Sequence, residues 1–108
     1  MNNQNIEPAF IIPVGNPRVK VNWLDVDHGD VNFGGRDKLL AGCGDNNVYV
    51  LNLERLNVVD VLRGHTSYVH CVAAANSAGV SVLSASEDGT VKFWDTRYYF
   101  NIALPLHH

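Results

Sequence analysis

Two stretches of this 108-residue sequence repeat each other at a fixed distance. When LLAGCGDNNVYVLNLE (39–54) is laid over VLSASEDGTVKFWDTR (82–97), Asp45 falls on Asp88, an offset of 43 residues, and the alignment needs no gap. A repeat of this length indicates one supersecondary unit that occurs twice and that must bury its apolar face against its neighbour. This constraint limits the folds open to the chain more than any other feature.

Short apolar runs divided by turn signals predict that the units are made of β-strands. The turns DNN (45–47) and EDG (87–89) each separate two such runs, and no segment shows a sustained period of about 3.6 residues. The expected strands cover 21–27, 38–44, 48–54, 56–62, 68–75, 80–86 and 90–96. Four short strands per repeat of this length are typical of a propeller blade, so the prediction is an all-β fold: a β-propeller fragment of about two four-stranded blades.

The sequence divides into four parts on this reading. Residues 1–20 are rich in Asn and Pro and predict an irregular leader. Residues 21–62 form the first, degenerate blade, and residues 63–97 form the second. Residues 98–108 are a divergent tail in which YFNIAL is a candidate replacement strand. Because a closed propeller needs more blades than two, we expect a fragment or a truncated gene model.

Composition excludes several broad classes of protein. The net charge of −3 is too weak to attract nucleic acid through a general field, and 46% hydrophobic residues argue against disorder. Cys43 and Cys71 lie in apolar runs outside any CxxC pair, which indicates small buried residues in a reducing compartment. No apolar run approaches the ~18 residues of a membrane span, so no membrane partner is expected.

The second unit begins with Gly64-His65 and ends with Trp94-Asp95, and in this it resembles the WD-repeat family. The resemblance implies a structural hydrogen-bond network. This network would join the loop before the innermost strand to the rest of the blade. Its members would be a His in that loop, a Ser on the second strand, an Asp in the tight turn between the second and third strands, and a Trp indole. A buried indole N–H and a buried carboxylate both need such partners. The residues that match are His65, Ser84 or Ser86, Asp88 and Trp94.

The first unit departs from this pattern. Leu51 takes the position of the Trp, while Ala41 and Cys43 stand where the serines would be, and no Gly-His pair precedes them at the matching offset. We therefore expect the first blade to be held by apolar packing without the polar network. The packing residues are Leu40, Val48, Val50 and Leu51.

Chemical readings of the same residues are weaker. His65, Ser86 and Asp88 have the residue types of a hydrolase triad, but no G-x-S-x-G turn presents the serine. His70-Cys71 with Cys43 matches no zinc spacing, and adjacent strand residues point to opposite faces. The segment GCGDN lacks the remainder of a phosphate-binding loop. The prediction is no catalytic residue, no cofactor and no metal.

A closer resemblance comes from the order of three segments: GCGDNNVYVLNLE, LRGHTSYVHCV and SASEDGTVKFWDTR. Over residues 20–97 they resemble the WD-repeat subunits of the THO complex. The resemblance implies a non-catalytic nuclear scaffold in the THO/transcription-export (TREX) assembly, which acts in mRNA processing and mRNA export. Its partners would be other protein subunits, with RNA contact indirect if any.

Three other functions are compatible with the sequence. One is a WD-repeat adaptor of another complex, either a ubiquitin-ligase substrate receptor or a signalling scaffold. Another is a small hydrolase that uses Ser86, His65 and Asp88. Direct RNA binding is the third, but its basic residues are scattered, and Phe93 and Trp94 are expected to pack within the blade.

Overall fold

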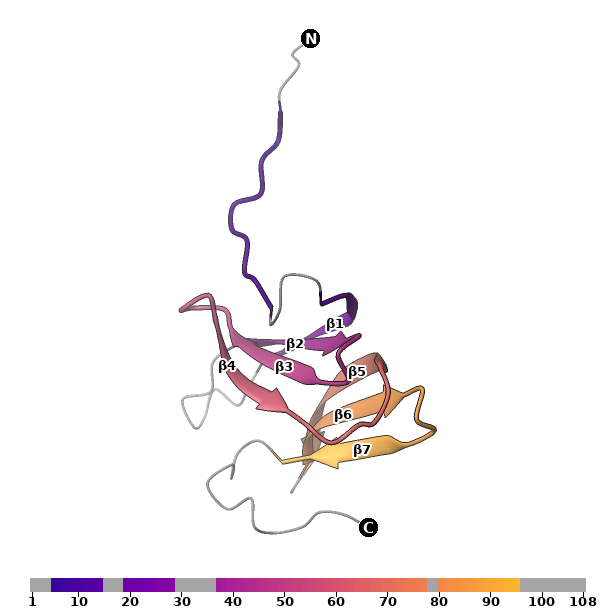
Figure 1. The fold of residues 1–108 in the computed structure, drawn as a ribbon. Helices are drawn as coiled ribbons and strands as arrows, with labels where there is room; N and C mark the ends of the chain where they lie inside the picture. The colour runs from indigo at the N-terminus through magenta and orange to yellow at the C-terminus, as the bar shows by residue number, and fades with distance from the viewer. Residues whose placement is uncertain (1–4, 15–18, 29–36, 78–79, 96–108) are drawn as a thin grey trace.

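The computed structural model describes residues 5–14, 19–28, 37–77 and 80–95, and these form two antiparallel sheets with no helix (Figure 1). The first sheet has the order β1-β2-β3-β4 and the second the order β5-β6-β7. The strands are β1 (Val21–Asp27), β2 (Lys38–Cys43), β3 (Val48–Asn52), β4 (Asn57–Leu62), β5 (Val69–Ser77), β6 (Val80–Ser86) and β7 (Val91–Trp94). The predicted all-β class is confirmed. The second sheet has three described strands where four were expected, and the tail lies outside the described residues.

The sequence repeat is a repeat of one hairpin turn. In the β2–β3 turn the amide of Cys43 donates to the carbonyl of Asn47 at 3.0 Å, and in the β6–β7 turn Ser86 donates to Thr90 at 3.1 Å. The backbone takes φ of 75° at Asn46 and 86° at Gly89, which are again 43 residues apart. Asn and Gly are the residues that adopt this left-handed conformation most readily. The offset in the sequence therefore reports a shared turn geometry.

An apolar core lies between the two sheets. Branched aliphatic side chains from both sheets are almost fully buried there, and each contributes about 1.5–3 kcal/mol when it leaves water. Val48 and Val50 are two residues apart on β3, as are Val72 and Ala74 on β5, so each pair lies on one side of its strand. The core consists of Leu40, Val48, Val50, Leu62, Val69, Val72 and Val82, with Ala74 and Trp94 packed at its margin. The four packing residues expected for the first blade, Leu51 included, are all buried.

Two side chains of β1 satisfy backbone groups of β5, the first strand of the other sheet. The Asn22 amide donates to the carbonyl of Val69 at 2.9 Å, and the amide of Ala74 donates to the Asp25 carboxylate at 2.8 Å. β5 is an edge strand in its sheet, so these groups have no ladder partner on that side. β1 thus covers the edge of β5, and these two strands lie side by side as in adjacent propeller blades (Figure 1).

The opposite face of the first sheet is covered by the segment that precedes β1. Ala41, Cys43, Tyr49 and Leu51 form a second buried cluster on that face. Ile12, Val14 and Val19 pack against it without forming a strand, together with apolar residues of β2 and β4. Earlier in the chain Ile6, Phe10 and Ile11 are exposed, where the segment extends away from the sheets (Figure 1). Part of the predicted irregular leader therefore covers this second buried cluster.

Candidate functional site

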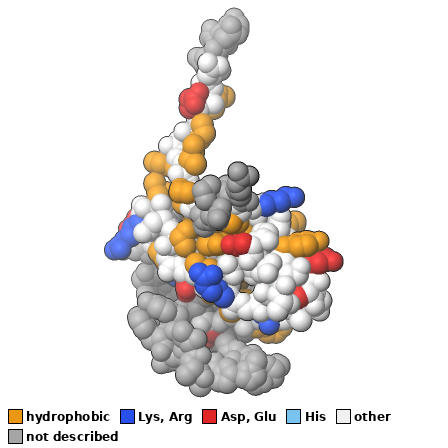
Figure 2. All heavy atoms as spheres, in the orientation of Figure 1, with side chains coloured by type: hydrophobic (Ala, Val, Ile, Leu, Met, Phe, Trp, Pro, Cys, Tyr) orange, Lys and Arg blue, Asp and Glu red, His pale blue; other side chains and the backbone are white. Residues whose placement is uncertain are grey.

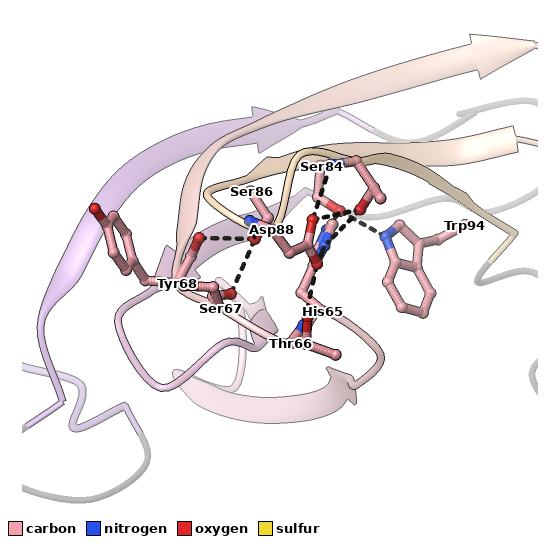
Figure 3. Close-up of polar contacts among 9 residues, drawn as sticks. His65, Thr66, Ser67, Tyr68, Ser84, Ser86, Asp88 and Trp94 are labelled. Atoms are coloured by element: carbon pink, nitrogen blue, oxygen red, sulfur yellow. Dashed lines mark hydrogen bonds and ion pairs between the residues drawn. The ribbon is translucent and has the colours of Figure 1, made fainter.

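A chain of hydrogen bonds crosses the second sheet from Trp94 to Asp88 (Figure 3). The indole Nε1 of Trp94 lies 2.8 Å from Ser84 Oγ, and Ser84 Oγ lies 2.7 Å from Nε2 of His65. Nδ1 of His65 lies 2.9 Å from Asp88 Oδ2. Because the indole N–H can only donate and a carboxylate can only accept, Trp94 donates to Ser84 and Nδ1 of His65 donates to Asp88.

Asp88 accepts hydrogen bonds from two further segments. Its Oδ2 accepts from the amide of Thr66 at 3.0 Å, and its Oδ1 accepts from the amide of Thr90 at 2.9 Å and from the Thr90 hydroxyl at 2.5 Å. The Thr90 hydroxyl, followed by His65 and the two amides, holds the pKa of Asp88 far below its usual 3.8, although partial desolvation opposes the shift. The carboxylate is therefore ionised at neutral pH and joins the loop before β5 to the β6–β7 turn.

Ser86 makes a separate set of contacts. Its hydroxyl lies 3.0 Å from the carbonyl of Ser67 and 2.9 Å from that of Tyr68, and it accepts the amide of Asp88 at 3.0 Å. Of the two candidate serines, Ser84 is the one against His65, while Ser86 connects to the network only through the backbone of Asp88. The triad with Ser86 as nucleophile is wrong, because the hydroxyl of that serine does not contact the imidazole.

Ser84, His65 and Asp88 have the order of a catalytic triad, but the site is closed to substrate. Ser84 is 1% exposed and His65 is 6% exposed. The Ser84 oxygen also accepts the Trp94 N–H, so the serine is engaged with both the indole and the imidazole. The arrangement fastens the loop before β5 to the second sheet.

The candidate metal ligands are separated. Within the described ranges, no three His, Cys, Asp or Glu side chains are grouped so that they could hold a metal ion. Cys43 is buried in the first sheet, where burial and then Asp45 raise the pKa of its thiol to about 11, and Cys71 lies partly buried in the second. Both thiols are free.

No helix in the described part of the chain is long and apolar enough to cross a membrane.

The matching turn of the first sheet has a polar cluster of its own that sequence reasoning missed. Tyr49 donates its hydroxyl to the Asp45 carboxylate, which also accepts from the backbone and side-chain nitrogens of Asn47, each at 3.3 Å. Burial and the hydrogen bond to Asp45 raise the pKa of Tyr49. In the sequence, this cluster is indicated by a tyrosine four residues after the aspartate of the turn, because this spacing places both groups at the same end of one hairpin.

The expectation that Phe93 packs within the blade is wrong. Strand alternation in β7 turns Lys92 and Trp94 toward the loop that begins at Gly64, and turns Val91 and Phe93 to the other face. Phe93 is 56% exposed and Val91 is 61% exposed, whereas Trp94 is partly buried at the margin of the core.

Comparison with known proteins agrees with this geometry. The family model "WD domain, G-beta repeat" matches residues 56–95, which include the complete network. The chain contains a WD repeat. With its two adjacent antiparallel sheets, it has the architecture of part of a β-propeller, as predicted.

Most of the chain is also similar to THO complex subunit 6 proteins, so the predicted resemblance is confirmed. The homolog of Danio rerio is 41% identical over 93 residues, 86% of this chain, and that of Drosophila melanogaster is 37% identical over 90 residues, 83% of this chain. The Homo sapiens protein is 46% identical over 59 residues, 55% of this chain. The matches cover 25%, 23% and 17% of those proteins, so this chain spans a quarter or less of their length.

Proposed function

We propose that this chain is a non-catalytic WD-repeat scaffold that acts in the THO/transcription-export complex, in the nucleus, in mRNA processing and mRNA export. The names of the relatives support the assembly, and the WD repeat supports a role in protein–protein contact. The observation that carries the scaffold role is the closed network, because its Ser, His and Asp side chains bind one another and Trp94. Its partners are other protein subunits.

The network has a structural role in this proposal. His65, Ser84, Asp88 and Trp94 join the loop before β5 to β6 and β7, and Ser86 fixes the same loop through the carbonyls of Ser67 and Tyr68. Fixed loops at the end of a sheet offer a partner a surface that needs no ordering on binding.

Contact with RNA is indirect in this account. On the face drawn in Figure 2, the Lys and Arg side chains are scattered among Asp and Glu and do not form a basic stripe. A nucleic-acid surface gathers positive charge along a groove or a face, because neutralised phosphates supply most of its affinity.

Depletion and rescue in the cells that express the protein test the function in mRNA export. After depletion, we expect polyadenylated RNA to accumulate in the nucleus, as seen by fluorescence in situ hybridisation with an oligo(dT) probe. Re-expression of the wild-type protein and of Ser81→Ala, which lacks only a hydroxyl outside the network, should restore the distribution. Unchanged nuclear and cytoplasmic RNA after depletion would contradict the proposal and favour an adaptor of another complex.

A further inference from the structure

Three side chains form a surface cluster at the end of the second sheet that the buried network does not include. Nε2 of His70 lies 2.6 Å from Glu87 Oε1, and the rings of Tyr68 and His70 meet edge to face with centroids 4.8 Å apart. Tyr68 is 41% exposed, and the side chains of His70 and Glu87 are each about half exposed. We refer to Tyr68, His70 and Glu87 as the end cluster.

The backbone holds the end cluster in place. The amide of Glu87 donates to the carbonyl of Tyr68 at 3.0 Å, and the Ser86 hydroxyl lies 2.9 Å from the same carbonyl. The pairing of β5 with β6 shifts register between Val69 and Cys71, so His70 lies at the irregular position of the strand. Such an irregularity redirects a side chain, and here the imidazole lies over the next turn. The cluster is therefore pre-formed on a rigid edge.

The exposed groups of the end cluster suit a planar cation. Within the described part of the chain, the side chain of Glu87 is hydrogen-bonded to His70 through Oε1, and 53% of this side chain is exposed. Tyr68 presents its ring beside the same imidazole, and Figure 3 shows its side chain pointing away from the buried network. A guanidinium group can bind a carboxylate through a pair of N–H donors and can stack on an aromatic face, whereas an ammonium group is a point charge.

We propose that the end cluster is a docking site for an arginine-containing segment of a partner protein. Glu87 binds the guanidinium, Tyr68 stacks against it, and His70 holds Glu87 in place as a positioning residue. The carboxylate disfavours a phosphate group at this position, so the site selects a basic peptide over RNA. This inference rests on the proposed scaffold function and names the chemistry of one contact.

Titration of the whole chain with a fluorescein-labelled peptide, GSGRGSG, tests the site by fluorescence anisotropy. We expect Glu87→Gln and Tyr68→Ala to weaken binding about two- to fivefold, as expected for loss of an exposed charged pair or an exposed cation–π contact, and Tyr68→Phe to leave it unchanged. Glu54→Gln removes the same charge from the exposed β3–β4 turn and serves as the matched control. Peptides with Lys or citrulline in place of Arg should bind progressively more weakly.

Several outcomes would overturn the proposal. The first is that the Arg peptide shows no saturable binding below ~1 mM, which is the weakest affinity of interest for a single contact. The second is equal binding of the Arg peptide by the wild type and by Glu87→Gln. The third is that the citrulline peptide binds as well as the Arg peptide. Binding of an oligouridylate that Glu87→Gln strengthens and the Arg peptide displaces would assign the surface to RNA instead. If the peptide fails while THO subunits still co-purify with the chain, only this inference fails. If the peptide binds but no THO subunit co-purifies, the proposed function fails and the site stands.

Discussion

At the scale of single residues, the WD motif indicated the members of the network but could not choose between the two serines. Ser84 and Ser86 are two positions apart on β6 and so lie on the same face of the strand, where either satisfies the motif. The pairing of Ser84 with Lys92, two residues before Trp94, decides that Ser84 is beside the indole. Strand pairing is set by the whole hairpin, so spacing along the sequence could not supply it.

Replacement of Ser84 by Ala should destabilise the fold by about 2–3 kcal/mol, because the Trp94 N–H and Nε2 of His65 lose their partner in a buried site. Ser81 is the matched control on the same strand, since its buried hydroxyl has no hydrogen-bond partner among the described residues. Ser81→Ala should leave the free energy of unfolding unchanged or raise it. The free energies come from urea denaturation, and equal losses in the two variants would contradict a role for the network.

Asp88 should make the stability depend on pH in the acid range. Because the pKa of Asp88 is lower in the folded state than its usual 3.8, its contribution is fully present above about pH 4 and is lost as the pH falls toward the folded value. We expect Asp88→Asn to melt below the wild type at pH 7 and the difference in Tm to shrink between pH 5 and pH 2. A difference that stays constant over this range would show that the carboxylate is not stabilised by its neighbours.

At the scale of elements, all seven strands were predictable from short apolar runs and turn signals, to within a few residues at their ends. The turns could be found because Asp, Asn and Gly occupy positions that need a left-handed backbone or a side-chain acceptor. The contact between the sheets could not be found in this way. Asn22 and Asp25 read as ordinary polar positions of a strand, and their role depends on which edge of β5 lies opposite them.

Gly42 should be intolerant of a side chain, because the sheets approach each other closely there. A Cβ at this position would lie 2.8 Å from Val69 Cγ1 and 3.1 Å from Val72 Cγ1, and both valines are buried in the shared core. Gly42→Ala should cost about 1–3 kcal/mol of unfolding free energy through overpacking. At Gly44 the nearest atom is Lys20 Cβ at 3.5 Å, so Gly44→Ala is the control. A Gly42→Ala protein as stable as this control would mean that the sheets do not pack at this distance.

Asp25 should protect one backbone amide of the other sheet from hydrogen exchange. Asp25→Leu removes the acceptor of the Ala74 amide, so this amide should exchange faster with solvent deuterium. Asp25→Asn keeps an oxygen at the same place and should retain much of the protection. Exchange measured by NMR separates the two, and an Ala74 rate that Asp25→Leu leaves unchanged would contradict the edge contact.

At the scale of the whole molecule, the two sheets cover each other on one side only. Val91 and Phe93 are exposed on the other face of the second sheet, and the chain matches only about a quarter of the length of the THO relatives. The propeller class followed from the period of the repeat, but neither the period nor the packing identifies a partner. The proposed THO assembly is inferred from similarity to the THO relatives. The end cluster is the structural candidate for one contact with a partner.

Affinity capture of the tagged chain from nuclear extract, with quantitative mass spectrometry, tests whether the chain assembles with subunits of the THO complex. We expect subunits of the THO complex to be enriched over an untagged control and ribonuclease treatment to leave the enrichment in place. Ser84→Ala should reduce the enrichment, whereas Ser81→Ala should not. Enrichment of cullin adaptors or signalling proteins in place of THO subunits would contradict the proposed function, as would THO enrichment that ribonuclease abolishes.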